Sequence, residues 1–215
     1  MQTSIVVLGL VMLTGFSGML SLASAALMAV GGYSYYILLK YIAISPWLAV
    51  ILSIVITVVI GTLLAFPSFR LSGAFLTVTT IGFAEIIRIL ILNLEPITGG
   101  AYGTSDFPRF VANTSHLQIL MTITIVFLAI AVRRIGDSRI GLAFKAIRQD
   151  LIAAEVMGVD VKRAKTVVYA LYSLFAGISG VFFATLTGYL SPDSFTTAES
   201  ITPLLMVVMG MNSPV

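Results

Sequence analysis

Between residues 46 and 66 the chain reads PWLAVILSIVITVVIGTLLAF, without a charged side chain, and Pro67 follows directly. About 20 apolar residues in a helix are enough to cross the hydrocarbon layer of a bilayer. In that layer every backbone N–H and C=O group must be bonded within the protein, which favours helices. The stretch therefore predicts a membrane-spanning helix over residues 46–66 that is closed by the proline.

The composition of the whole chain supports a membrane environment. Of its 215 residues, 59% are hydrophobic and 10% are charged, whereas soluble domains average about 25% charged residues. A soluble core of this size could not hide so much apolar surface, but lipid tails accept it directly. We therefore predict an all-α fold, a single polytopic transmembrane helix bundle that comprises residues 1–215. Cysteine is absent, so disulfides and thiolate chemistry are excluded.

Other apolar stretches predict further spans. The first, residues 5–39, is too long for one span and is interrupted by Gly15, Ser17 and Gly18, which predicts two segments with a break near residues 15–22. Residues 71–94, 117–132 and 166–190 predict later spans, and residues 201–211 begin another apolar run.

Basic residues are concentrated in one loop. Eight of the twelve lysine and arginine residues lie between Arg133 and Lys165. Acidic residues are interleaved and apolar segments flank the loop, so we favour a cytoplasmic loop at about 133–165 over a nucleic-acid-binding patch. This orientation places residues 95–116 and 191–199 on the outside.

An amphipathic helix is expected within this loop. Gly158 is a natural helix stop, and Asp160 can cap the next helix. The helix would rest on lipid headgroups or dock in a groove of a cytoplasmic partner. Its apolar residues recur at helical spacing: Ile140, Phe144, Ile147, Leu151 and Ala154.

Two charges stand inside a predicted span. Glu85 and Arg88 are three residues apart, so they share a helix face and can form an ion pair. A lone charge in hydrocarbon costs roughly 2.5–3.5 kcal/mol on insertion scales. The pair is therefore either a structural ion pair or part of a transport pathway.

Small residues within the predicted spans can be interpreted in more than one way. Ala176, Gly180 and Ala184 recur every four residues, which predicts close helix packing. Gly-x-Ser-Gly occurs at residues 15–18 and 177–180, a weak sign of internal duplication and of an intramembrane serine protease. A protease needs a base for the serine, and the sole histidine, His116, is predicted in an external loop, so this enzyme class is disfavoured.

Other functions can be weighed from absent motifs. The sequence has no Gly-x-x-x-x-Gly-Lys-Ser/Thr motif and no His-Glu-x-x-His motif, so ATP hydrolysis would belong to another subunit and no metal or other cofactor is expected. A secondary transporter or channel remains an alternative, although the spans hold few ionisable residues to bind coupling ions.

Several stretches in one order resemble the permease subunits of bacterial ABC importers for branched-chain amino acids, of the LivM-like type. They are GFSGMLSL at 15–22, RLSGAF at 70–75, TGG at 98–100, SRIG at 138–141, AIR at 146–148, SPDSF at 191–195 and LLMVV at 204–208. Ala153, Ala154 and Gly158 are similar to the ATPase-docking loop of ABC importers, although Ile152 stands where many such loops have Glu.

The resemblance implies a multi-pass subunit of a bacterial inner membrane. Its partners would be a related permease, two cytoplasmic ATPases, an extracytoplasmic solute-binding protein and membrane lipid. Ile147 and Arg148 would join residues 153, 154 and 158 in coupling, and Ser17, Gly18 and Ser21 are pathway or structural candidates with the ion pair. A urea or short-chain amide permease is the alternative. The family continues beyond Val215, which predicts a truncated or partial copy.

Overall fold

The computed structural model describes residues 2–71, 73–105 and 114–211. Met1, Ser72, residues 106–113 of the predicted external loop and residues 212–215 lie outside this part. The α-helices are α1 (Gln2–Leu10), α2 (Ser24–Lys40), α3 (Pro46–Leu63), α4 (Ala65–Ser68), α5 (Ala74–Asn93), α6 (Glu95–Thr98), α7 (Thr114–Gly136), α8 (Arg139–Gln149), α9 (Leu151–Val156), α10 (Val161–Thr187) and α11 (Thr197–Met211).

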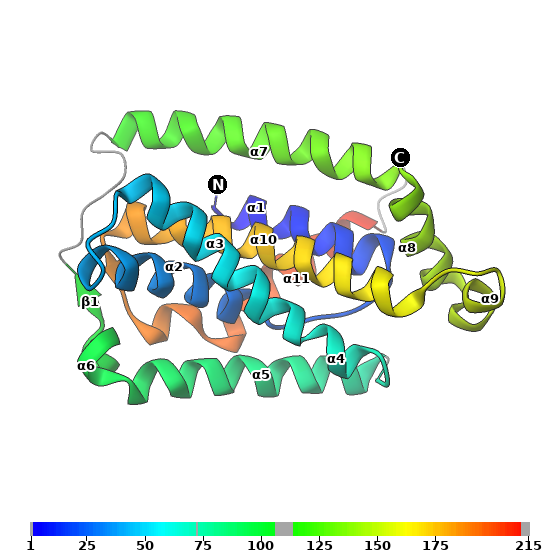
Figure 1. Cartoon of the computed structure of the whole chain (residues 1–215), viewed down its shortest axis with the longest axis horizontal. Helices are drawn as coiled ribbons and strands as arrows, with labels where there is room; N and C mark the ends of the chain where they lie inside the picture. Colours follow the sequence, from blue (N-terminus) through cyan, green and yellow to red (C-terminus); the bar gives the residue numbers. More distant parts are fainter. Residues whose placement is uncertain (1, 72, 106–113, 212–215) are drawn as a thin grey trace.

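Smaller elements complete the chain. A π-helical turn, η1 (Val11–Phe16), continues α1, and two 3-10 turns are η2 (Gly100–Tyr102) and η3 (Pro192–Phe195). Strands β1 (Thr104–Ser105) and β2 (Tyr189–Leu190) pair antiparallel, with Thr104 opposite Leu190. Figure 1 shows α6 and β1 at one end of the bundle, and α8 and α9 beyond the other.

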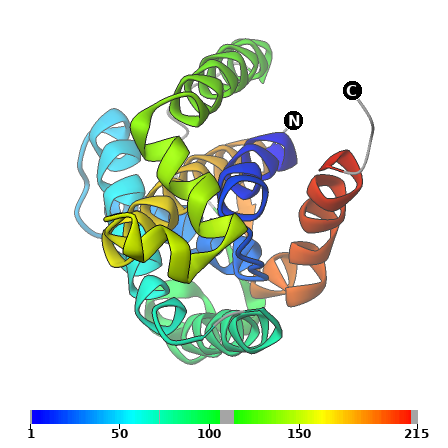
Figure 2. The same cartoon turned by 90° about the vertical axis from the view of Figure 1, so that its right-hand side faces the viewer.

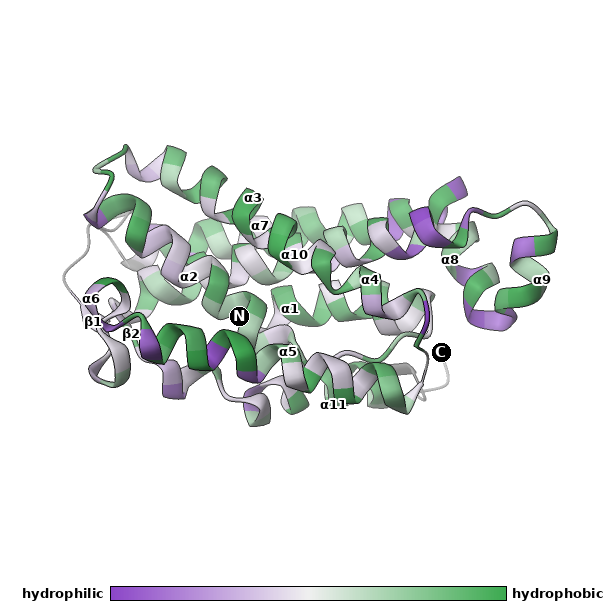
Figure 3. Ribbon diagram, turned by 60° about the horizontal axis from the view of Figure 1, so that its bottom comes forward, coloured by the Kyte–Doolittle hydropathy of each residue, from purple (hydrophilic) through white to green (hydrophobic). Residues whose placement is uncertain are grey.

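Four helical stretches of the described residues are long and apolar enough to cross a membrane: Pro46–Ser68, Ala74–Asn93, Ser115–Gly136 and Val161–Thr187. They confirm the four corresponding predicted spans. The last is mostly buried in the bundle, whereas the other three expose apolar side chains such as Val59, Phe75 and Phe127. Figure 3 shows hydrophobic residues along these helices and hydrophilic ones gathered at α8 and α9. The exposed apolar faces suit contact with lipid.

The centre of the bundle is a close contact between α2 and α10. A Cβ atom on Gly180 would lie 2.1 Å from the Met28 carbonyl oxygen, and one on Gly31 would lie 2.8 Å from the Gly177 carbonyl oxygen. Only glycine lets the two backbones come so near. The predicted small-residue packing of Gly180 is therefore confirmed: Gly180 faces Met28 and Gly32 of α2, and Gly31 of α2 faces Gly177.

The first apolar stretch is broken, as predicted. The helix formed by α1 and η1 ends at Phe16, and α2 begins at Ser24. The intervening residues 17–23 are not helical, and Figure 1 shows them running back along the bundle from the end of η1 to the start of α2. We refer to residues 17–23 as the break.

The predicted amphipathic helix consists of two helices. Asp150 is extended (φ −155°), and its carboxylate accepts hydrogen bonds from the N–H groups of Ile152 at 2.9 Å and Ala153 at 3.1 Å. The prediction of one continuous apolar stripe through Leu151 was wrong, because the Asp150 side chain ends α8 and caps a new helix, α9. In Figure 2, viewed from this end, α8 and α9 lie across the bundle.

The helix stop and start signals after α9 are confirmed. Gly158 has a φ of +85°, a left-handed conformation that glycine adopts without strain. Asp160 accepts a hydrogen bond from the Arg163 N–H at 3.0 Å, which caps α10.

We expect Gly180→Ala to lower the stability of the bundle by about 2 kcal/mol, because its Cβ would collide with the Met28 carbonyl and force α2 away from α10. Thermal unfolding of the purified protein in detergent measures this loss. Gly82→Ala on α5 is the matched control, since among the described residues nothing lies within 4 Å of the carbon added there. Equal melting temperatures for the two variants would contradict the close contact.

Candidate functional site

The break is held by hydrogen bonds from several helices. The Leu22 N–H donates to the Thr80 hydroxyl of α5 at 3.0 Å, and the Ala25 N–H donates to the Ser200 hydroxyl of α11 at 2.9 Å. The Thr14 hydroxyl donates to the Met19 carbonyl at 3.0 Å. Irregular backbone is tolerated within a membrane only where it is buried in protein or lines a cavity. These bonds supply the partners that water would supply elsewhere.

The turn into the break requires glycine. Gly18 has a φ of +72°, and its N–H donates to the Thr14 carbonyl at 3.1 Å. The Ser17 hydroxyl donates to the Leu13 carbonyl, which therefore remains bonded although the helix has ended. Ser21 is fully buried, and its hydroxyl accepts from the Ala23 N–H at 3.3 Å. All three sequence candidates in this region thus shape the break.

Helix α8 is fastened to the end of the first helix. A guanidinium nitrogen of Arg148, Nη1, donates to the Gly15 carbonyl in the last turn of η1. The Lys145 ammonium lies 5.7 Å from the centre of the Phe16 ring. Cations are favourable at the carboxyl end of a helix, where carbonyl groups lack helical partners. We call the contact between Arg148 and Gly15 the arginine latch.

A cavity of about 180 Å³ lies beside the arginine latch. It brings together residues from three stretches on which the family resemblance rests, 15–22, 70–75 and 146–148. Its lining residues are Ser17, Gly18, Met19, Leu71, Gly73, Leu76, Ile147, Arg148, Leu151 and Lys165. The structure therefore places two pathway candidates next to two coupling candidates.

Lys165 is a member of this region that sequence reasoning did not single out. Its side chain is buried, and its ammonium donates to the Ser68 carbonyl at the end of α4. A lysine in the second turn of a long apolar helix was a visible signal. No local signal pointed to its partner, the Ser68 carbonyl, which lies 97 residues away.

The remaining coupling candidates lie around α9. Ala154 is buried against the bundle, whereas Ala153 and Gly158 are exposed. Three apolar side chains of this region are also exposed: Ile152 by 73%, Val156 by 82% and Met157 by 85%. We call Ile152, Val156 and Met157 the apolar tip.

The charges inside α5 form the expected ion pair. Arg88 Nη1 lies 3.1 Å from Glu85 Oε1, and Arg88 Nη2 lies 3.4 Å from Asp193 Oδ1 of η3. The contact of Arg88 with Asp193 was not predicted. All three side chains are partly exposed, so the pairs contribute little stability in water. The triad joins α5 to η3 and lines neither the break nor the cavity beside the arginine latch.

We expect Arg148→Gln to loosen the end of the first helix. The variant loses a charged hydrogen bond worth about 1 kcal/mol for a partly exposed side chain. Amide hydrogen exchange should become faster for residues 13–19, with little change in α3. Arg139→Gln, at an exposed position on the same helix, should leave exchange as it is. Unchanged exchange in Arg148→Gln would show that the arginine latch does not hold η1.

The apolar helices and the largely buried break define a multi-pass membrane protein. Over residues 1–215 the chain matches the family described as branched-chain amino acid transport system / permease component, and it belongs to this family. The expected family resemblance is thus confirmed. No solved structure matches the chain.

Named relatives agree with this membership. The chain is 32% identical to the high-affinity branched-chain amino acid transport system permease protein LivM of Salmonella typhimurium, over 94% of this chain and 55% of the relative. The protein of the same name from Escherichia coli gives the same identity and coverage. A probable branched-chain amino acid transport permease protein LivM of Methanocaldococcus jannaschii is 26% identical over 76% of this chain and 49% of its own length. The chain spans about half the length of these curated relatives.

The relatives are named as transport permeases, which supports a transport component over an enzyme.

Proposed function

We propose that this chain is a membrane-spanning permease subunit of an ABC importer, and that it carries branched-chain amino acids across a bacterial inner membrane. A related permease would complete the pathway, an extracytoplasmic protein would deliver the solute, and two ATPase subunits would hydrolyse ATP. The family membership and the relatives' names support this proposal. The chain itself would need no cofactor, because it has no phosphate-binding loop of its own.

The observation that carries the coupling role is the apolar tip. Three large apolar side chains are exposed together on a short element that projects beyond the bundle (Figure 1). Apolar side chains clustered outside the lipid-facing surface mark a protein contact. The flanking loop is the basic one, which the positive-inside rule assigns to the cytoplasm. We therefore propose that the apolar tip docks on an ATPase subunit.

A route from the apolar tip to the break is supported by the contacts. Asp150 joins α9 to α8 through its capping hydrogen bonds, and Arg148 joins α8 to Gly15 through the arginine latch. When ATP binding moves the ATPases, α9 and α8 would shift together, and the end of η1 would follow. Small shifts of packed helices are an established kind of conformational switch. Here the shift would be taken up at the break, and it would open the pathway to one side of the membrane or the other.

We expect Ile152→Asp to weaken association with the ATPase subunits at least about tenfold, because it places a charge in an apolar contact. Co-purification from membranes and the gel-filtration profile in detergent measure association and folding separately. Ile152→Leu is the control, since it keeps an apolar side chain of the same size. Full retention of the ATPases by the Asp variant would contradict docking at the apolar tip.

Gly158→Val should also weaken this association. Valine at a φ of +85° is strained by about 1–2 kcal/mol, and the loop after α9 must change shape to relieve it. Because no other residue of the described part of the chain lies within 4 Å of a Cβ atom added at Gly158, the bundle itself should unfold at the wild-type temperature. A lowered melting temperature with unchanged ATPase binding would assign Gly158 to folding alone.

A further inference from the structure

The cavity beside the arginine latch holds two basic side chains from different helices. Lys165 of α10 is only 4% exposed, and Arg148 of α8 lines the same space. Each donates a hydrogen bond to a backbone carbonyl, Lys165 to that of Ser68 and Arg148 to that of Gly15. A carbonyl accepts a hydrogen bond but carries no net charge, so both positive charges remain.

No carboxylate neutralises these two charges within residues 2–71, 73–105 and 114–211. Neither Lys165 nor Arg148 forms an ion pair there, and the described lining residues include no aspartate or glutamate. A buried charge without an opposite charge beside it is costly. Lysine has three N–H donors and arginine has five, so each retains donors beyond its bond to a carbonyl. The two cations are therefore equipped to bind an anion that enters the cavity.

The amino end of a helix lines the same cavity. Helix α5 begins at Ala74, and Gly73 and Leu76 beside this end are lining residues. No described side chain caps the helix, and the Thr77 N–H is the donor to the Gly73 carbonyl, at 3.3 Å. The N–H groups before Thr77 lack helical acceptors and carry the positive end of the helix dipole. Together with the two cations, they favour an anion that has several oxygen atoms.

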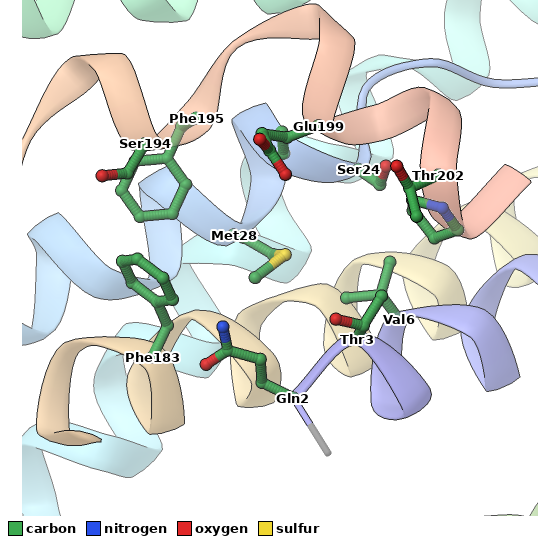
Figure 4. A pocket seen from close by; sticks show the side chains of 12 residues that line it. Gln2, Thr3, Val6, Ser24, Met28, Phe183, Ser194, Phe195, Glu199 and Thr202 are labelled. Atoms are coloured by element: carbon green, nitrogen blue, oxygen red, sulfur yellow. The ribbon is translucent and has the colours of Figure 1, made fainter. Parts of the chain in front are cut away.

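A second cavity shows that the start of a helix does not by itself select an anion. It measures about 100 Å³ and lies at the start of α2 (Figure 4). Its charged lining residue is Glu199, and its described lining residues include no lysine or arginine. The Glu199 carboxylate would repel an anion. The cavity at α5 therefore differs from it in the charges that decide the sign of a ligand.

The position of the cavity suits a lipid headgroup as well as a soluble anion. Helix α8 belongs to the basic loop, whereas α5 and α10 are long and apolar enough to cross a membrane. Basic pockets between membrane helices on the cytoplasmic side bind anionic headgroups. Phe75 and Val78 of α5 are exposed by 75% and 66%, so this helix also offers acyl chains an apolar surface.

We propose that this cavity is a binding site for a phosphate group, carried either by an anionic lipid or by a small soluble phosphate. The phosphate oxygens accept from the Lys165 ammonium, from the remaining guanidinium nitrogens of Arg148 and from the first N–H groups of α5. The ligand thus ties α5, α8 and α10 together beside the break. It is distinct from a transported solute, and the site stands whether or not the proposed transport function holds.

Binding of two probes to the purified protein in neutral detergent tests the proposal. Native mass spectrometry measures bound phosphatidylglycerol, and equilibrium dialysis measures bound radiolabelled inorganic phosphate. At least one probe should bind the wild type, and Lys165→Met should weaken that binding about tenfold, because a charge-assisted contact is lost. Lys162→Met makes the same change at an exposed position of α10 and should bind as the wild type does.

The two probes also identify the source of the phosphate. Binding of phosphatidylglycerol alone would assign the site to a lipid headgroup, and binding of inorganic phosphate alone would assign it to a soluble anion. Either result supports the proposal when it depends on Lys165. No binding of either probe, or equal binding by the wild type and Lys165→Met, would overturn it.

Leu151→Glu tests the cavity without removing a basic residue, so it decides the matter even if Lys165→Met fails to fold. Leu151 lines the cavity and is 37% exposed, so a carboxylate added there can take the place of the anion. Binding of the probe should fall about tenfold through repulsion between like charges. Leu151→Gln has the same size without the charge and should bind as the wild type does. Equal binding by the Glu and Gln variants would contradict an anion site.

Discussion

Backbone hydrogen bonding without water is the constraint on which the rest of this structure depends. In hydrocarbon an unpaired N–H or C=O group costs several kcal/mol, so a chain can leave the helix only where other groups replace the lost bonds. Residues 17–23 and the first turn of α2 meet that condition through Thr80 of α5 and Ser200 of α11, which accept from the N–H groups of Leu22 and Ala25. Arg148 performs the corresponding task for a carbonyl at the end of η1.

The same constraint explains why the functional regions lie where they do. A helix that starts inside a bundle presents N–H groups there, and a helix that ends there presents carbonyl groups. The first attract anions and the second attract cations. In this protein the two kinds of end are separated along the chain by only the break. The arginine latch, which places a cation at the carboxyl end of η1, is therefore a consequence of this interruption.

How far the sequence could predict these features depended on whether each signal was local. The long helices, the interruption near residues 15–22, the stop at Gly158 and the cap at Asp160 all follow from neighbouring residues, and all are present. The pairing of Glu85 with Arg88 is likewise local, whereas its third partner, Asp193, lies 105 residues away. The helix boundary at Asp150 was missed because the apolar residues on both sides of it keep helical spacing, and this spacing outweighed the preference of Asp150 for capping a helix.

By itself the sequence determined that the protein lies in a bilayer, which helices cross it and where the first helix is interrupted. The signals for these features are the length of apolar stretches, the positions of glycine and the density of charged residues, and each is a property of neighbouring residues. The tertiary structure alone decided which side chains form hydrogen bonds with the backbone in and beside the break. Thr80, Arg148 and Ser200 come from parts of the chain that only folding brings near it. It also decided that α2 and α10 touch through Gly31 and Gly180. A glycine pattern shows that a helix can be approached closely, but the partner is selected by the packing of the whole bundle.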